Sequence, residues 1–197
     1  TKLDPRIQGI APYVQGQSML SHGDSLHPAL VRGIDPLIEG EVSDFKKVIG
    51  GRLTDLEAGQ FRVVLGLELA RALNVSVGDK ITVIAPAGQI TPAGVIPRLK
   101  AFTIAAVVET GHFEYDSGLV LMNIEDAARF YRTPGPTGLR VKLSKMDEAP
   151  SVARVLESFV PQDVWVRDWS VQNRTWFAAV KTEKRMMFII LTLIIAV

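Results

Sequence analysis

The residues with the clearest capacity for chemistry lie in one short stretch of the chain, between positions 109 and 116. His112 stands there among the carboxylates of Glu109, Glu114 and Asp116. One imidazole with several carboxylate oxygens suits some divalent ions. An acidic turn between two strands explains the same residues without a metal, and we favour that interpretation because the histidine is not part of an HExxH motif.

Other catalytic arrangements are excluded by their motifs. Ser25 lies near His22 and Asp24, but in a predicted turn rather than in the strand-to-helix elbow that exposes a nucleophilic serine. The sequence has no Gly-x-x-x-x-Gly-Lys-Ser/Thr phosphate loop, so this chain is not an ATPase. It has no cysteine, which excludes disulfides and thiolate sites. We therefore predict no catalytic residue, no bound metal and no cofactor.

The composition is that of a folded protein with a large core. The chain has 197 residues, of which 47% are hydrophobic and 22% are charged, so it can form one large domain or two small ones. The formal net charge of +1 gives no electrostatic footprint for nucleic acid.

The hydrophobic pattern predicts a mixed α+β fold. Gly23-Asp24 marks a hairpin between a strand that starts near Ile7 and a strand over 27–34. Asn123 is a good N-cap for the helix that follows it, and Asp126 is placed to complete a capping box. The other predicted strands are 60–65, 81–85, 102–108, 119–122, 139–143 and 164–169. The other predicted helices are 68–73, a helix with the apolar stripe Val152, Val155, Leu156 and Phe159, and one long helix from Ser170.

Strand pairing predicts how the chain is divided. Residues 133–136 (Thr-Pro-Gly-Pro) break the chain, and the strands at 137–169 need partners because two strands alone do not make a stable sheet. The N-terminal strands are the natural partners. We therefore predict one subdomain from 1–35 and 136–169, with a mainly-β subdomain inserted at 36–135.

The last twelve residues carry no charge, glycine or proline. A bilayer-spanning helix needs about 20 apolar residues, so 186–197 is either a buried C-terminal core helix or the start of a transmembrane helix. We favour the second interpretation, because a helix that is apolar on every face has no polar side to present to water. Residues 170–185 would then form a stalk helix, and both chain ends are expected to continue into a longer protein.

The segment 86–100 separates two strong strands and is longer than an ordinary hairpin loop. Pro86, Pro92 and Pro97 argue against an interior strand. Its apolar residues could cover an edge of the core, which the pattern alone slightly favours. They could instead lie on a protruding arm that docks a partner through apolar contacts, with Arg98 and Lys100 as cations at its base.

Several motifs resemble one permease family. The run Gln89–Pro97 resembles the hook loop of LolC-type subunits in the LolC/LolE family of lipoprotein-releasing ABC transporter permeases. Residues 67–79 and 116–127 are similar to the strand–helix–Gly-Asp–strand signature, and to the strand and helix that follow it, in the wider MacB/FtsX permease superfamily. The run from Trp176 to Met187 resembles the lead-in to that superfamily's second transmembrane helix.

The resemblance implies an inner-membrane permease with this region in the periplasm, where a split porter-like subdomain carries an inserted Sabre-like subdomain. It also implies a separate ATPase subunit, a second permease subunit, and capture of the periplasmic lipoprotein carrier LolA during the export of lipoprotein substrates. By position, the basic patch beside the hook is Arg98 and Lys100. The hook itself is Pro86, Ile90, Thr91, Pro92, Ala93, Gly94, Val95, Ile96 and Pro97.

Alternatives remain open within and beyond this family. Ala93 stands where the family is expected to have a larger apolar residue, so the contact at the tip would be smaller. A hook favours the LolC or hybrid type over the LolE type. A MacB-like efflux permease or an FtsX-like signalling permease would share the architecture, and a soluble hydrolase is the weakest alternative.

Overall fold

The computed structural model describes residues 4–43, 45–91, 94–161, 163–169, 182–183, 186–188, 190–192 and 194. The described helices, with two 3-10 turns labelled η, are α1 (Glu39–Val42), η1 (Leu53–Asp55), α2 (Leu67–Ala72), α3 (Phe113–Asp116), α4 (Ile124–Tyr131), η2 (Met146–Glu148) and α5 (Ala149–Glu157). The described strands are β1 (Ile7–His22), β2 (Ser25–Ile34), β3 (Lys47–Ile49), β4 (Arg62–Gly66), β5 (Lys80–Thr91), β6 (Gly94–Glu109), β7 (Leu119–Asn123) and β8 (Gly138–Leu143).

Six of these strands close into a ring, in the order β2-β7-β4-β6-β5-β1, because β1 pairs back onto β2. The β2–β7 and β4–β6 pairs are parallel, and the other four pairs are antiparallel. β3 adds to β6 and β8 adds to β1. Closure gives each of the six strands two neighbours, which satisfies backbone groups that an open sheet would leave at its edges.

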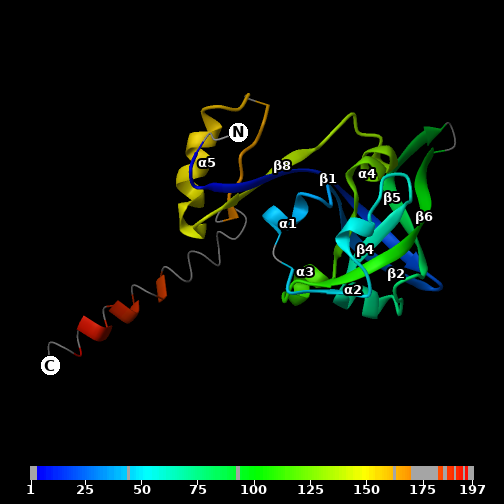
Figure 1. Cartoon of the computed structure of the whole chain (residues 1–197), viewed down its shortest axis with the longest axis horizontal. Coiled ribbons are helices and arrows are strands. Elements are labelled where there is room, and N and C mark those ends of the chain that lie inside the picture. Colours follow the sequence, from blue (N-terminus) through cyan, green and yellow to red (C-terminus); the bar gives the residue numbers. More distant parts are fainter. Residues whose placement is uncertain are drawn as a thin grey trace. The chain divides into compact units, whose positions relative to one another are not determined.

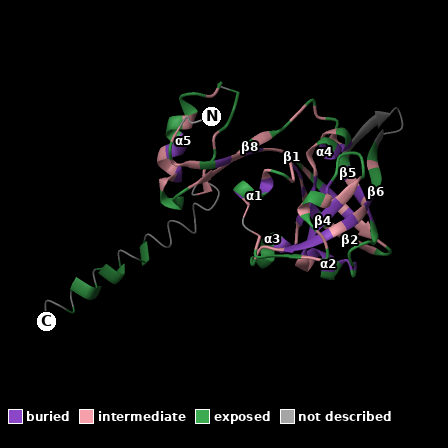
Figure 2. Cartoon of the chain, viewed as in Figure 1, coloured by how far each residue is buried: buried purple, intermediate pink, exposed green. Residues whose placement is uncertain are grey.

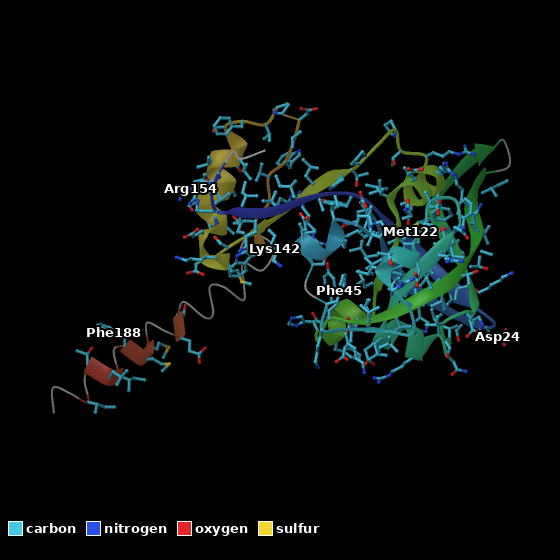
Figure 3. All side chains as sticks on the ribbon, in the orientation of Figure 1. Asp24, Phe45, Met122, Lys142, Arg154 and Phe188 are labelled. Carbon is cyan, nitrogen blue, oxygen red and sulfur yellow. The ribbon has the colours of Figure 1, made fainter. Side chains whose placement is uncertain are left out.

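Alternation along the strands directs one set of apolar side chains into the ring. Figure 2 shows buried residues along the strands of the ring. Val31, Val63, Val83, Val120 and Met122 are completely buried there, and Figure 3 labels Met122 among the packed strands. α2 and α4 add further apolar side chains to this cluster. A second, smaller core lies around Leu56, Val64 and Leu121. The main core therefore packs the ring, α2 and α4 together, and the far ends of β5 and β6 extend from this packed body.

The predicted capping of α4 is half right. The Asn123 side chain accepts a hydrogen bond from the Glu125 N–H at 2.9 Å, as predicted. Asp126 does not complete a capping box, because its carboxylate accepts hydrogen bonds from the Gly59 N–H at 2.8 Å and the Phe61 N–H at 3.1 Å. Asp126 is fully buried, and these two hydrogen bonds connect α4 to the loop before β4.

α4 lies unusually close to the strands beneath it because two of the facing residues are glycines. A Cβ atom on Gly33 of β2 would overlap the Cβ of Ala127, and one on Gly16 of β1 would overlap the ring of Tyr131. The Tyr131 hydroxyl also shares a 2.6 Å hydrogen bond with the hydroxyl of Ser18 on β1. These contacts fix the position of α4 on the ring.

The chain divides into two compact units, one of residues 8–142 and one of residues 1–7 with 143–197. The predicted subdomain boundaries at 35 and 136 stay a prediction. In the structure β2 pairs with β7 over five residues, from Leu30 to Ile34, so residues up to 34 belong to the ring.

Two predictions for the C-terminal unit are wrong. No strand forms at 164–169, where Val164 and Trp165 are exposed and the backbone joins no ladder. Of the predicted stripe on α5, only Val152 is buried. Val155 is exposed within the helix, and Phe159 lies beyond the helix end at Glu157 and is 66% exposed. Ala149 and Ala153 complete the buried face of α5.

The predicted long helix lies largely outside the described residues. This applies to Ser170, to Trp176 and to most of the proposed stalk at 170–185. Of the described residues in 186–194, all are helical and the apolar ones are exposed, including Phe188 at 72% (Figures 2 and 3). Within the described residues, no single helix combines the length and the hydropathy needed to cross a bilayer.

The close approach of α4 at Gly33 can be tested by substitution. Gly33→Ala should lower the free energy of unfolding by about 1–3 kcal/mol, because the added methyl group must displace α4 or β2. Chemical denaturation followed by circular dichroism measures this loss. Gly40→Ala is the matched control, since a Cβ there meets no atom within 4 Å, and it should leave stability unchanged or slightly higher. Equal stability of the two variants would contradict the packing.

Candidate docking arm

The segment predicted as a long loop is a β-ribbon. β5 and β6 continue to pair beyond the body of the ring, with Gln89 opposite Ile96 and Thr91 opposite Gly94 (Figure 1). The predicted strand ends at Ala85 and Phe102 are therefore wrong, because each strand extends further toward the tip. We call residues 86–97 the arm, in which 89–91 pair with 94–96. The side chain of Ile96 is 56% exposed, so this residue does not cover a core edge.

The arm joins the ring at a large bulge. Ala85 pairs with Arg98 and Gln89 pairs with Ile96, so the three β5 residues 86–88 stand opposite the single β6 residue Pro97. Pro86 and Pro97 lack the N–H that a ladder hydrogen bond requires, which explains why the regular register breaks between these two pairs. Pro92 and Ala93 of the predicted hook lie outside the described residues, as do the side chains of Ile90, Thr91 and Val95.

Both cations of the predicted basic patch contact their own chain. Arg98 is half-buried, and its Nη1 donates to the carbonyl oxygen of Phe130 at 3.1 Å. The ammonium of Lys100 lies 3.2 Å from the centroid of the Phe61 ring, a cation–π contact. Lys100 itself is exposed, so a partner can still reach it.

An aromatic cluster supports these two cations. Phe61 packs edge-to-face on Phe102, Phe102 on Phe130, and Phe130 on Tyr131, with ring centroids 5.0–5.8 Å apart. Burial raises the pKa of the Tyr131 phenol, and its hydrogen bond with Ser18 partly opposes that rise. Phe61 has a φ of +49°, an uncommon conformation that the two hydrogen bonds to Asp126 hold in place. The base of the arm therefore packs on this aromatic cluster.

The sequence analysis missed an apolar stripe beside the arm. Leu99 is paired with Ile84, Ile84 with Met19, and Met19 with Pro28, so four apolar residues cross four strands on one face. Leu99 is 62% exposed, and Pro28 is exposed as well. Single-strand alternation could not reveal the stripe, because the stripe depends on the register between strands that are distant in sequence.

A groove of about 460 Å³ continues this stripe past the base of the arm. Its lining includes Met19, Pro28 and Leu30 from the hairpin of β1 and β2, with Tyr115 from α3 and Pro86 from the arm. The arm, the stripe and the groove together form an exposed, largely apolar surface on the unit of residues 8–142.

Comparison with protein-family models decides the assignment. Residues 2–159 match the model of the MacB-like periplasmic core domain. The chain belongs to this family of MacB-like periplasmic core domains.

Two solved transporter domains share its fold. The periplasmic region of MacB from Actinobacillus actinomycetemcomitans superposes with a TM-score of 0.53 at 18% identity, over 88% of this chain and 78% of that one. The extracellular domain of the transporter YknZ from Gram-positive bacteria gives a TM-score of 0.50 at 11% identity, over 80% and 78%. The predicted α+β fold class is confirmed.

Sequence relatives confirm the predicted resemblance to the LolC/LolE family. The chain is 46% identical over 194 residues to the lipoprotein-releasing system transmembrane protein LolC of Neisseria meningitidis, over 97% of this chain and 47% of that protein. It is 31% identical to LolC of Haemophilus influenzae, over 83% of this chain and 39% of that protein, and 23% identical to LolE of the same organism, over 98% and 47%. The chain thus spans about half the length of these relatives. They are named as transmembrane proteins of a transport system, which agrees with the prediction that this chain is not an enzyme.

In this MacB-like domain, the residues first considered for metal chemistry hold a turn. Asp116 is 3% exposed and accepts hydrogen bonds from the backbone N–H and the hydroxyl of Thr110, at 3.0 and 2.8 Å. Glu109 forms an ion pair with Lys46 at 2.9 Å, which raises the pKa of Lys46. In the described part of the chain, no three His, Asp or Glu side chains are arranged to hold a metal ion. The acidic-turn interpretation accounts for these contacts.

The contact of Asp126 with the loop under Lys100 can be tested. Asp126→Ala should lower the free energy of unfolding by about 1.5–3 kcal/mol, because the N–H groups of Gly59 and Phe61 lose their charged acceptor. Urea denaturation of the variant measures the loss. Glu125→Ala removes the neighbouring exposed carboxylate, paired with Arg129 at 3.5 Å, and should cost no more than about 0.5–1 kcal/mol. Similar losses from both substitutions would mean that Asp126 does not hold this loop.

Proposed function

We propose that this chain is the periplasmic domain of a lipoprotein-releasing ABC transporter permease in the bacterial inner membrane. We propose further that the arm docks the soluble periplasmic lipoprotein carrier, LolA in the family that the sequence resembles. ATP hydrolysis would occur on a separate ATPase subunit, and a second permease subunit, of the same or a related type, would complete the transporter. Similarity to LolC over nearly the whole chain supports this role.

The geometry of the arm is the observation that carries the proposal. A two-stranded ribbon that extends past the ring exposes apolar surface at Ile96, where a free-standing domain would gain more by burying it. The proline bulge at the root limits the conformations of the arm before binding, which lowers the entropy lost on docking. We expect a carrier of acylated proteins to present apolar surface, and such a surface suits an apolar arm.

The stripe and the groove supply a second surface for the same partner. Leu99 is exposed at the root of the arm, on the same face as the stripe, and Lys100 is an exposed residue on the opposite face of β6. A carrier that contacts both must therefore reach around β6. In this proposal, Lys100 contributes a cation at the rim of an otherwise apolar interface.

The C-terminal residues support a membrane anchor. The described side chains of Met186, Phe188 and Leu191 are exposed although they are apolar, and burial in lipid would remove that cost. We propose that 170–185 is a stalk and that a transmembrane helix begins at 186, so that motion driven by the ATPase reaches the arm through the stalk.

The type of subunit is part of the proposal. Of the two Haemophilus influenzae relatives, LolC is more identical to this chain than LolE is, which favours a LolC-type or hybrid subunit. A MacB-like efflux permease, which would dock an adaptor protein instead, is the second candidate because it has the same fold.

Replacement of residues 92–96 by Gly and Ser tests the docking role. The replacement should abolish carrier binding, because the apolar tip and its stiffening proline are both lost, while the thermal unfolding curve should stay unchanged. Ile96→Ser alone should weaken binding about tenfold, the usual effect of losing one well-packed apolar contact at an interface. Surface plasmon resonance with purified carrier measures both effects.

Leu37→Ser provides the matched control, since Leu37 is an 80% exposed apolar residue in a turn outside the arm. It should bind the carrier with unchanged affinity. If the replaced arm still binds the carrier, the docking role is wrong. If the native chain does not bind the carrier but binds an efflux adaptor, the MacB-like function is correct.

A further inference from the structure

The bulge at the root of the arm raises the question of what sets the direction of the arm. Between Ala85–Arg98 and Gln89–Ile96 the ladder is interrupted, and Pro86 and Pro97 cannot donate hydrogen bonds across the gap. On β6 only Pro97, whose φ is fixed, separates Arg98 from the paired residue Ile96, so the direction in which β6 leaves Arg98 carries over to the arm. The body-side ladder ends at the Ala85–Arg98 pair, so a contact that fixes this pair also fixes that direction.

Arg98 is the β6 residue of that last pair, and its side chain turns back to the body. Its Nη1 donates to the carbonyl oxygen of Phe130 at 3.1 Å, one residue before the end of α4. Carbonyl groups in the last turn of a helix lack helical partners and carry the negative end of the helix dipole, so they suit a guanidinium well. This is a charge-assisted hydrogen bond between the root of the arm and a helix end.

The helix end that receives Arg98 is itself fixed. Phe130 is 6% exposed and packs edge-to-face on Phe102 with centroids 5.7 Å apart. Its neighbour Tyr131 shares the 2.6 Å hydrogen bond with Ser18 on β1. Since Phe102 belongs to β6 and Ser18 belongs to β1, the Phe130 carbonyl is held relative to two strands of the ring.

The guanidinium is poorly placed to act as a contact cation. Its Nε is buried and has no hydrogen-bond partner within the described residues, and the side chain as a whole is half-buried. Burying part of a guanidinium costs free energy that a cation on an open patch would not incur. Lys100, two residues further along the same strand face, has an exposed side chain by comparison.

We infer that Arg98 is a positioning residue that sets the direction of the arm by tying its root to the C-terminus of α4, rather than a cation that contacts the carrier. The inference rests on the proposed carrier-docking function. Without this tie, the arm samples more directions, and only the fraction that matches the docked geometry binds.

The test compares Arg98→Gln with Arg129→Gln in the same chain. Both changes remove one positive charge, but Arg129 is exposed and pairs only with Glu125 on its own helix among the described contacts. Arg98→Gln should weaken carrier binding about tenfold, since a lost charge-assisted hydrogen bond shifts the seated fraction by about that factor. The weakening should be equal at low and high salt, because it comes from the direction of the arm. Arg129→Gln should leave the affinity unchanged.

Hydrogen exchange in the free chain gives a readout without the carrier. Arg98→Gln should speed exchange at the amides of Gln89 and Ile96 beyond the bulge, while Val63 and Val120 in the ring should exchange at the native rate. Arg98→Lys retains a donor for the Phe130 carbonyl and should give intermediate exchange and affinity. This milder variant covers the case in which Arg98→Gln does not fold.

Two results would overturn the inference. If the defect of Arg98→Gln shrinks toward zero at high salt, Arg98 is a contact cation. If affinity and arm exchange both stay at native values, Arg98 has no role in the arm. Failure of the docking function itself looks different, because then the replaced arm at 92–96 would bind the carrier as well as the native chain does.

Discussion

The close packing of α4 against β1 and β2 is the constraint on which the rest of this surface depends. Two glycines, Gly16 and Gly33, leave room for the helix, and side chains at those positions would push it outward. Because α4 packs at this position, Asp126 hydrogen-bonds the loop that carries Phe61, and the carbonyl oxygen of Phe130 accepts a hydrogen bond from Arg98. The close contact between α4 and the strands therefore positions the groups that both cations at the root of the arm contact.

This arrangement resolves two opposing needs of a docking arm. An arm must expose apolar surface to a partner, yet exposed and mobile apolar residues favour non-specific association. Confining the exposed residues to a short ribbon, with a proline bulge at its root and a packed aromatic seat beneath it, limits the motion without hiding the surface. The closed ring serves the same purpose, because it leaves few unpaired strand edges near the arm that could join another chain.

Much of the fold follows from local pattern, and the failures have physical reasons. Short apolar runs predicted β2, β4 and β7, and the Asn123 cap predicted the start of α4, because these signals act within a few residues. The arm was predicted as a loop because prolines interrupt interior strands. In a two-stranded ribbon each strand has one unpaired side, and at a bulge the ladder is already broken, so Pro86 and Pro97 are tolerated there. Val164 and Trp165 carried a strand pattern, but a strand needs a neighbour, and none of the described strands pairs with them.

The roles of Arg98 and Asp126 could not be predicted from their neighbours in the sequence. Both residues had plausible local roles, a surface cation and a capping carboxylate. Their actual contacts lie 32 residues away for Arg98, and 67 and 65 residues away for Asp126, on elements that only the ring brings near. Charged groups are costly to bury, so a charged side chain that turns into the protein needs a hydrogen-bonding partner there. Here those partners are a helix-end carbonyl and two N–H groups of an irregular loop. The charged residues nearest the arm therefore serve the geometry of the arm first, and Lys100, although it is an exposed residue, holds its ammonium over the Phe61 ring.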